Sequence, residues 1–335
     1  MSTARAAEPT AAHGPGAGAS APGTGARRIL DSPWSWVAGL YVLSVAVYLL
    51  LALRSPLPVL FPDEFRYSHL ARALADGQGF DWRGQHIRQS AALYVYFITP
   101  AWALLHSTVD AYHASKALGT LALCTQVVPV WLLGRELVGP RLALLPAALA
   151  VAGTWMLSSA EAVTETLAFP LTTAALCVAV MALRRPGSRF GWLALALLGL
   201  ATWARLQVGI LVPALLVALL LDVVRDPVRR RERLRAHRPY LVAAGAGLAA
   251  IVVVGAAAPS LAGDYAEFFS FRPSLHRILS KSGLQLLELV ATAGLVPVLL
   301  AAAAALSPRA WRDDRTGPLL AVFWPAALAT VLQSG

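Results

Sequence analysis

The sequence predicts an all-α polytopic membrane protein, because it is too apolar for a water-soluble fold and its apolar residues occur in long blocks. Hydrophobic residues make up 57% of the 335 positions and charged residues 14%, whereas a soluble domain has about 25% charged residues. The mean hydropathy is +0.61. Blocks of about 15 to 21 apolar residues have lengths typical of membrane-spanning helices. Barrel strands would instead alternate polar and apolar residues.

The charge pattern indicates membrane orientation and gives no support to a nucleic-acid partner. The formal net charge is +10, but the arginines fall in short loops between apolar blocks, as expected for cytoplasmic loops. Cys124 and Cys177 lie inside apolar blocks, so neither a disulfide framework nor a cysteine-based metal site is predicted. Residues 1–33 are rich in Ala, Gly, Pro and Ser, which predicts a disordered cytoplasmic tail before a transmembrane domain over 34–335.

The topology follows from placing every basic cluster on the cytoplasmic side of the plasma membrane. This requires an even number of crossings between neighbouring clusters. The short segment 93–105, which contains Pro100, is therefore assigned to the interface. We expect about nine crossings, an N-terminus in the cytoplasm and a first outer loop over 54–110. The expected crossings are 36–53, 115–133, 142–157, 167–183, two short helices on either side of Arg205 within 191–221, 240–258, 286–306 and 319–332.

The first outer loop begins with an acidic pair at the start of a predicted amphipathic helix. Asp63 and Glu64 precede apolar residues at helical spacing, from Tyr67 to Leu74, and glycines at 77 and 79 end the helix. The two carboxylates could merely satisfy free amides and the helix dipole. Paired carboxylates at a membrane boundary are costly, however, unless they bind a cation or act as a base. We therefore expect the chemistry of the protein to occur here.

The motifs of this region resemble those of the GT-C membrane glycosyltransferases, in particular the bacterial relatives of protein O-mannosyltransferases and lipid A aminoarabinose transferase. The resemblance covers 36–220. Its motifs are the acidic pair, Leu70-Ala71-Arg72-Ala73-Leu74 with Gly77-Gln78-Gly79-Phe80, Ala92-Leu93-Tyr94, Gly134-Arg135-Glu136-Leu137, and 161–170. It implies a GT-C-like helical bundle that moves a sugar from a polyprenyl-phosphate donor to an extracytoplasmic glycan, lipid or protein, with inversion. By resemblance, Asp63 is the general base and Glu64 a second carboxylate or cation ligand.

The second outer loop supplies two further carboxylates, Glu161 and Glu165. Their four-residue spacing predicts that they share one face of a helix. By resemblance, Glu165 helps to hold a divalent metal or to orient the acceptor. Asp63, Glu64 and Glu165 together would suit Mg²⁺ or Mn²⁺. The alternative is that Glu161 and Glu165 are a solvated helix start.

Three basic residues are candidates for binding the donor phosphate. Arg205, between two short helices, offers a permanently charged fork, or else anchors a helix at the interface. Arg88 lies where relatives carry a basic residue ahead of Pro-Pro-Leu, although this chain has Ser90-Ala91-Ala92-Leu93. Lys281 lies in the basic and aromatic segment 259–283, which could instead be a plain amphipathic surface helix.

The sequence lacks three motifs that mark nucleotide-dependent or hydrolytic chemistry. The sequence has no P-loop, no Gly-x-Ser-x-Gly elbow and no His-Glu-x-x-His pair, so we expect no nucleotide cofactor and no zinc-hydrolase site. The main alternative is a transporter or flippase of lipid-linked or small solutes, which would place polar residues near the bilayer midplane. A noncatalytic envelope assembly protein, with the acidic pair only as a helix cap, is a further alternative.

Overall fold

The computed structural model of the protein describes residues 32–54, 62–87, 92–257 and 302–333. Several predictions lie outside these residues: the tail up to residue 31, Arg88, the outer segment 259–283 with Lys281, and the crossing 286–306 up to residue 301. The described helices are α2 (Pro33–Arg54), α3 (Pro62–Ala75), α4 (Ala92–Leu104), α5 (Thr108–Cys124), α6 (Val127–Val138), α7 (Leu144–Ala150), α8 (Glu165–Arg184), α9 (Phe190–Ala204), α10 (Leu211–Arg225), α11 (Arg230–Ala257), α15 (Pro308–Arg312) and α16 (Gly317–Gln333). Two 3₁₀ helices, η1 (Thr154–Ala160) and η2 (Leu206–Ile210), and the short strands β1 (Asp81–Trp82) and β2 (Gln85–His86) complete them.

The described part of the chain is a bundle of apolar helices, which confirms the all-α membrane class. Four candidate membrane spans occur in it: Pro33–Arg54, Thr108–Val138, Glu165–Arg184 and Leu206–Arg225. Large apolar side chains on α2, such as Trp36 and Val42, are 60% and 63% exposed. Helices that satisfy their own backbone hydrogen bonds can present such a surface to lipid. The predicted total of nine crossings remains a prediction.

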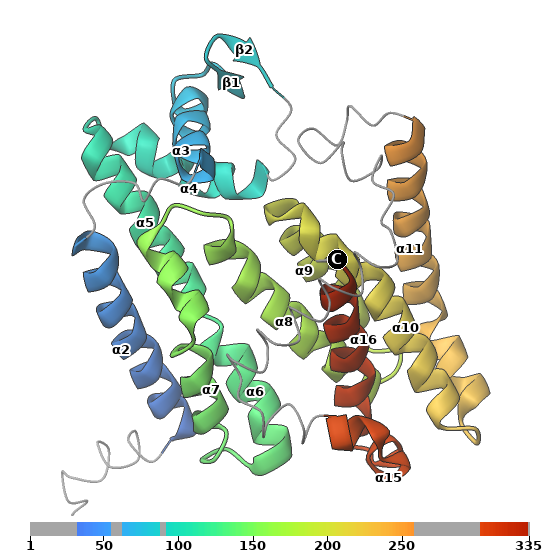
Figure 1. The fold of residues 1–335 in the computed structure, drawn as a ribbon. Coiled ribbons are helices and arrows are strands. Elements are labelled where there is room, and N and C mark those ends of the chain that lie inside the picture. The colour runs from blue at the N-terminus through green and yellow to red at the C-terminus, as the bar shows by residue number, and fades with distance from the viewer. Residues whose placement is uncertain (1–31, 55–61, 88–91, 258–301, 334–335) are drawn as a thin grey trace, which may run out of the picture.

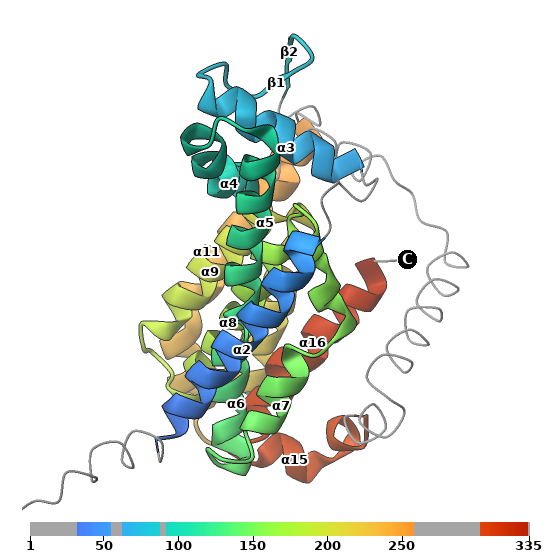
Figure 2. The ribbon, with the colours of Figure 1, turned by 90° about the vertical axis from the view of Figure 1, so that its left-hand side faces the viewer.

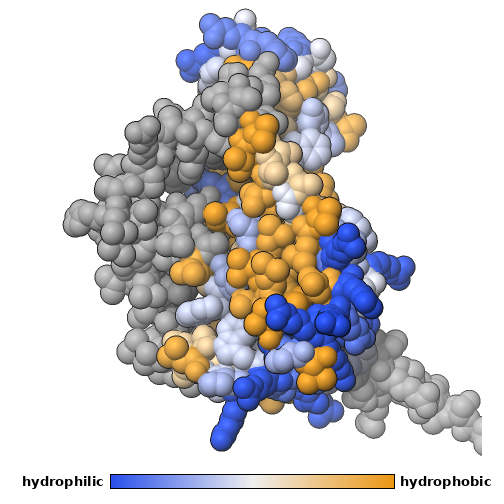
Figure 3. Space-filling view, turned by 90° about the vertical axis from the view of Figure 1, so that its right-hand side faces the viewer, coloured by the Kyte–Doolittle hydropathy of each residue, from blue (hydrophilic) through white to orange (hydrophobic). Residues whose placement is uncertain are grey.

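The two ends of the bundle differ in character. Helix α3 and the β1–β2 hairpin lie at one end and α15 at the other (Figures 1 and 2). On the face shown in Figure 3, hydrophobic side chains form a band between hydrophilic surfaces at the two ends. Arg184 at the end of α8 donates to Glu136 and to the backbone carbonyl of Arg315. Basic segments that are distant in sequence therefore meet at one end, in agreement with the charge segregation read from the sequence.

Helix breaks fall at residues with an evident local cause. Helix α9 ends at Ala204, Arg205 is extended (φ −151°, ψ 109°), and η2 leads into α10, so the predicted break at Arg205 is confirmed. The span 108–138 is divided between α5 and α6, since Pro129 has no amide proton for the carbonyl of Thr125. The predicted crossing 142–157 is not one continuous helix. Gly153 is extended (ψ 159°) and separates the short α7 from η1.

Small side chains let the helices approach closely. One core joins α8, α9, α10 and α16 through residues such as Ala179, Ala194 and Ala218, and a second joins α2, α5, α6 and α7. Close approach through small residues is the usual way membrane helices associate. A third cluster packs α3 on α4, around Tyr67, Leu70 and Tyr94. This cluster fixes α3 on the end of the bundle.

Replacing Gly119 by Ala should destabilise the contact between α5 and α8. A Cβ atom at Gly119 would lie 2.9 Å from Oγ1 and 3.1 Å from Cβ of Thr166, a fully buried, β-branched side chain with little freedom to move. Such overpacking costs about 1–3 kcal/mol. Unfolding of the purified protein in detergent measures this loss. Gly199→Ala is the matched control: nothing lies within 4 Å of its Cβ, so it should leave stability unchanged or raise it by up to ~1 kcal/mol.

Candidate functional site

The acidic pair lies in the first turn of α3, as predicted, but its two members have different surroundings. Asp63 is exposed, whereas Glu64 is completely buried. Neighbouring residues of a helix point about 100° apart, so α3 can bury one carboxylate and present the other to water. Gly77 and Gly79, at φ +76° and +72°, follow the last turn of α3 in a conformation that L side chains rarely adopt.

Glu64 connects three separate parts of the chain. Its Oε1 atom accepts a hydrogen bond from the hydroxyl of Tyr112 on α5 and another from the backbone amide of Ala162, at 2.9 Å. Its Oε2 atom is also buried and has no hydrogen-bond partner among the described residues. Burying a carboxylate without partners is costly. Oε2 is therefore a place where a proton, a cation or a polar substrate group would be stabilised.

Lys116 supplies positive charge to the same buried region. It lies one helical turn after Tyr112 on α5 and is completely buried. Its Nζ donates to the carbonyl of Ala52 at 2.5 Å and lies 4.7 Å from the centroid of the Tyr112 ring. Lys116 and Glu64 interact electrostatically. The structure thus adds Tyr112 and Lys116 to the site. The sequence did carry a signal for Lys116, because a lysine inside an apolar block places a charge within a membrane span, and such charges are usually functional.

Glu161 and Glu165 do not share a helical face, so that prediction is wrong. Glu161 has extended backbone after η1 (φ −123°, ψ 153°), and α8 begins only at Glu165. The hydrogen bond from the Ala162 amide to Glu64 gives a physical reason, because it uses a backbone donor between the two glutamates in a tertiary contact. Glu161 is half-buried and remains close enough to Glu64 and Glu165 to interact with both charges.

Glu165 forms an ion pair with Arg205. Arg205 also donates from Nε to Oε1 of Gln207 at 2.5 Å, and the hydroxyl of Thr164 donates to Oε2 of Glu165 at 3.1 Å. The Glu165 and Arg205 side chains are 28% and 27% exposed, so the pair remains open to solvent. The structure therefore pairs Glu165, which was predicted to bind a metal, with Arg205, which was predicted to bind phosphate.

The three carboxylates predicted to bind a metal do not converge in the part of the chain that the structure describes. Asp63 is exposed, Glu64 is held by Tyr112 and Ala162, and Glu165 is paired with Arg205. Among the described residues, no group of three or more His, Cys, Asp or Glu side chains could hold a metal ion. This placement does not fit a three-carboxylate site, and Mg²⁺ or Mn²⁺ binding stays a prediction.

No family model, no curated protein and no solved structure matches this chain. The candidate site is therefore described by the geometry around Glu64. This site consists of the buried carboxylate of Glu64, the exposed carboxylate of Asp63 beside it, and the ion pair between Glu165 and Arg205.

Tyr112→Phe should destabilise the protein, because Glu64 would lose one of its two hydrogen bonds while staying buried. Leaving a buried polar group unsatisfied costs about 1–3 kcal/mol. Denaturation of the purified protein in detergent measures the change. Tyr96→Phe is the matched control, since Tyr96 is 47% exposed and should change stability by less than about 0.5 kcal/mol. Equal stabilities of the two variants would contradict the role assigned to Tyr112.

Glu161→Gln should stabilise the protein at alkaline pH and not at acidic pH. Burial raises the pKa of Glu161, and the negative charges of Glu64 and Glu165 raise it further. A carboxyl whose pKa is higher in the folded state binds its proton more tightly there, so its contribution is lost as pH rises through the folded pKa. The Tm gain of the variant should be present at about pH 8 and absent below about pH 4.5. Asp76→Asn, at an exposed carboxylate, should show no such difference.

Proposed function

We propose that this protein is an inverting glycosyltransferase of GT-C-like architecture, which moves a sugar from a polyprenyl-phosphate donor to an extracytoplasmic glycan, lipid or protein. The observation that carries the proposal is the anchoring of Glu64 by Tyr112 and Ala162, which holds the exposed Asp63 in place at one end of an apolar bundle. The basic segments gather at the opposite end. By the distribution of positive charge, the Asp63 end faces the outside of the plasma membrane.

Asp63 has the exposure that a general base requires. In the proposed step its carboxylate takes the proton of the acceptor hydroxyl as the hydroxyl oxygen forms a bond to the anomeric carbon. The bond between that carbon and the phosphate oxygen breaks, and the polyprenyl phosphate leaves with the electron pair. Attack opposite to the departing phosphate inverts the anomeric centre. Glu64 is a positioning residue in this scheme, because its buried Oε1 is already engaged by Tyr112 and Ala162.

Arg205 is the proposed ligand of the departing phosphate. A guanidinium has five N–H donors in a fixed plane. In Arg205, Nε contacts Gln207 and Nη1 contacts Glu165. The second terminal nitrogen can donate to a phosphate oxygen. Donors placed where negative charge develops stabilise the transition state. Glu165 orients the guanidinium and keeps the pair neutral before the donor binds.

The alternative is a transporter or flippase for lipid-linked or small solutes. Lys116 favours it, since this lysine is completely buried within the candidate span Thr108–Val138 and intramembrane charges often mark transport pathways. Lys116 donates to the carbonyl of Ala52 near the end of α2, however, and its charge interacts with that of Glu64 on α3, which places Lys116 toward the α3 end of the bundle. This position agrees better with a site at the membrane boundary.

Asp63→Asn should lower the rate of sugar transfer by at least about a hundredfold, the usual contribution of a general base. The assay uses proteoliposomes, a panel of synthetic polyprenyl-phosphate hexoses and pentoses, and an extract of cell-envelope acceptors. Product NMR reports the anomeric configuration, which should be inverted relative to the donor. Asp76→Asn, at an exposed carboxylate just after α3, should keep the wild-type rate within about twofold.

Two results would count against this proposal. Retained transfer by the Asp63→Asn variant would remove Asp63 as the base. Movement of labelled lipid-linked sugar across the vesicle bilayer, with no glycoside formed by the wild-type protein, would support the transporter.

A further inference from the structure

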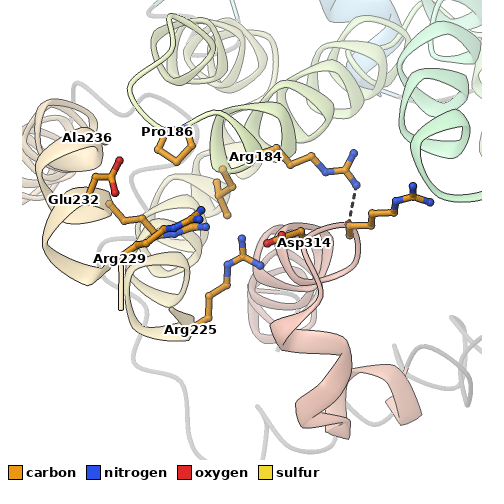
Figure 4. A pocket seen from close by; sticks show the side chains of 10 residues that line it. Arg184, Pro186, Arg225, Arg229, Glu232, Ala236 and Asp314 are labelled. Carbon is orange, nitrogen blue, oxygen red and sulfur yellow. Dashed lines mark hydrogen bonds between the residues drawn. The ribbon is translucent and has the colours of Figure 1, made fainter. Parts of the chain in front are cut away.

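A basic cavity lies at the end of the bundle opposite Asp63. It has a volume of about 440 Å³ and lies between the ends of α8 and α10, the first turns of α11 and the turn after α15 (Figure 4). Its charged lining residues are Arg184, Arg225, Arg229, Arg233 and Arg315, with Glu232 and Asp314. Five positive and two negative side chains thus face one space. This composition favours an anionic ligand.

The wall of the cavity is held by a completely buried carboxylate, Asp222. Arg225 donates from Nε to Oδ1 at 2.7 Å, Arg233 donates from Nη1 to both carboxylate oxygens at 2.8 and 2.7 Å, and Nε2 of His237 lies 2.9 Å from Oδ2. The Arg225 and Arg233 side chains are 8% and 10% exposed. Asp226 adds a longer ion pair to Arg233 at 3.6 Å. These arginines are therefore fixed before any ligand binds, which reduces the entropy cost of binding.

Hydrogen-bond donors remain available on the cavity side of this wall. Arg225 binds Asp222 through Nε. Its Nη1 packs against Gly317, and Nη2 makes no hydrogen bond with the described residues and is the donor left for a ligand. The guanidinium of Arg229 is exposed and makes no hydrogen bond or ion pair with the residues that the structure describes. Figure 4 shows Arg225 and Arg229 reaching toward the same space from neighbouring segments. Two guanidinium groups so placed match the oxygens of a phosphate.

Arg184 is less available, because its two terminal nitrogens already have partners. They donate to Oε2 of Glu136 at 3.1 Å and to the backbone carbonyl of Arg315 at 2.7 Å. The second bond fixes the backbone that carries the exposed Arg315 side chain at the rim of the cavity. Arg229 and Arg315 are thus the exposed cations of the lining, and neither holds the wall together.

A second hollow, which is apolar in part, adjoins the basic cavity. It has a volume of about 770 Å³ and shares Arg225, Arg233 and Asp314 with the first cavity. Asp226 and Arg312 add further charge, and the apolar part of its lining is Val224, Pro227, Leu306, Pro308 and Trp311. Val224 and Leu306 are 60% and 83% exposed. Two candidate spans end at Arg184 and Arg225, so both cavities lie at the membrane–water boundary, the depth of lipid headgroups and of interfacial tryptophans. A soluble phosphate would leave Val224 and Leu306 uncovered, whereas the acyl chains of a phospholipid would cover them.

We propose that the basic cavity binds the phosphate of an anionic phospholipid, with the glycerol and the upper acyl chains against the apolar side chains of the second hollow, Val224, Leu306 and Trp311. Arg225 and Arg229 would hold the phosphate oxygens, and Arg315 would add attraction for the net negative charge. The site is independent of the sugar-transfer chemistry assigned to Asp63, and it lies at the other end of the molecule.

Lipid binding to the full chain in detergent tests this site. Native mass spectrometry compares dioleoylphosphatidylglycerol, dioleoylphosphatidylcholine and, as a soluble phosphate, glycerol 1-phosphate. The wild-type protein should bind phosphatidylglycerol at least about tenfold more tightly than phosphatidylcholine, and R229Q/R315Q should lose about tenfold of that affinity. R235Q/R238Q, which removes the same charge from exposed positions of α11 outside the cavity, should stay within about twofold of wild type.

Three outcomes would overturn the proposal. The first is equal binding of the two lipids. The second is an equal loss of affinity in R229Q/R315Q and R235Q/R238Q, which would indicate a general charge effect. The third is binding of glycerol 1-phosphate as tight as that of phosphatidylglycerol, with the same arginine dependence, which would assign the cavity to a soluble phosphate. Both double variants change exposed side chains, so folding should persist in each; the melting temperature checks this.

Discussion

The burial of Glu64 is the interaction on which the candidate site depends. This carboxylate joins α3 to Tyr112, 48 residues away, and to Ala162, 98 residues away. Removing a charge from water is costly unless hydrogen bonds and opposite charge offset the loss. Tyr112, the Ala162 amide and Lys116 provide that compensation. Because α3 is fixed through Glu64, the adjacent Asp63 is held at the surface in a defined direction.

The two ends of the bundle each contain a buried acid, and the comparison indicates different roles. Asp222 contacts two arginines and a histidine through both of its oxygens. Glu64 has bonds to one oxygen only, and its Oε2 has no hydrogen-bond partner in the described residues. A carboxylate whose two oxygens both have hydrogen-bond partners stabilises the packing around it. A carboxylate with one buried oxygen that lacks a partner can still interact with a proton or a ligand. Burial alone therefore does not show which carboxylate oxygens can still bind a proton or a ligand, whereas the hydrogen-bond partners of each oxygen do.

Local sequence rules predicted the features that depend on local physics. The start of α3 at the acidic pair and its end before Gly77 follow from side chains within a few residues. The break at Arg205 follows instead from placing the basic clusters on one side of the membrane. The other features of the site depend on tertiary contacts, which local sequence rules do not predict. The shared helical face of Glu161 and Glu165 is absent because the Ala162 amide bonds to Glu64. Tyr112 and Lys116 enter the site only through folding, since nothing next to them in sequence points to Glu64.

The pairing of Arg205 with Glu165 sets a condition on any donor phosphate. A phosphate that takes over the guanidinium completely must displace a carboxylate of similar geometry, so the exchange would gain little free energy. A phosphate that binds the remaining terminal nitrogen keeps Glu165 in place and adds a charge-assisted hydrogen bond. The second arrangement also leaves Arg205 oriented by Gln207. For the proposed donor, these contacts favour a shared guanidinium, in which Glu165 would position Arg205 for the phosphate without competing with it.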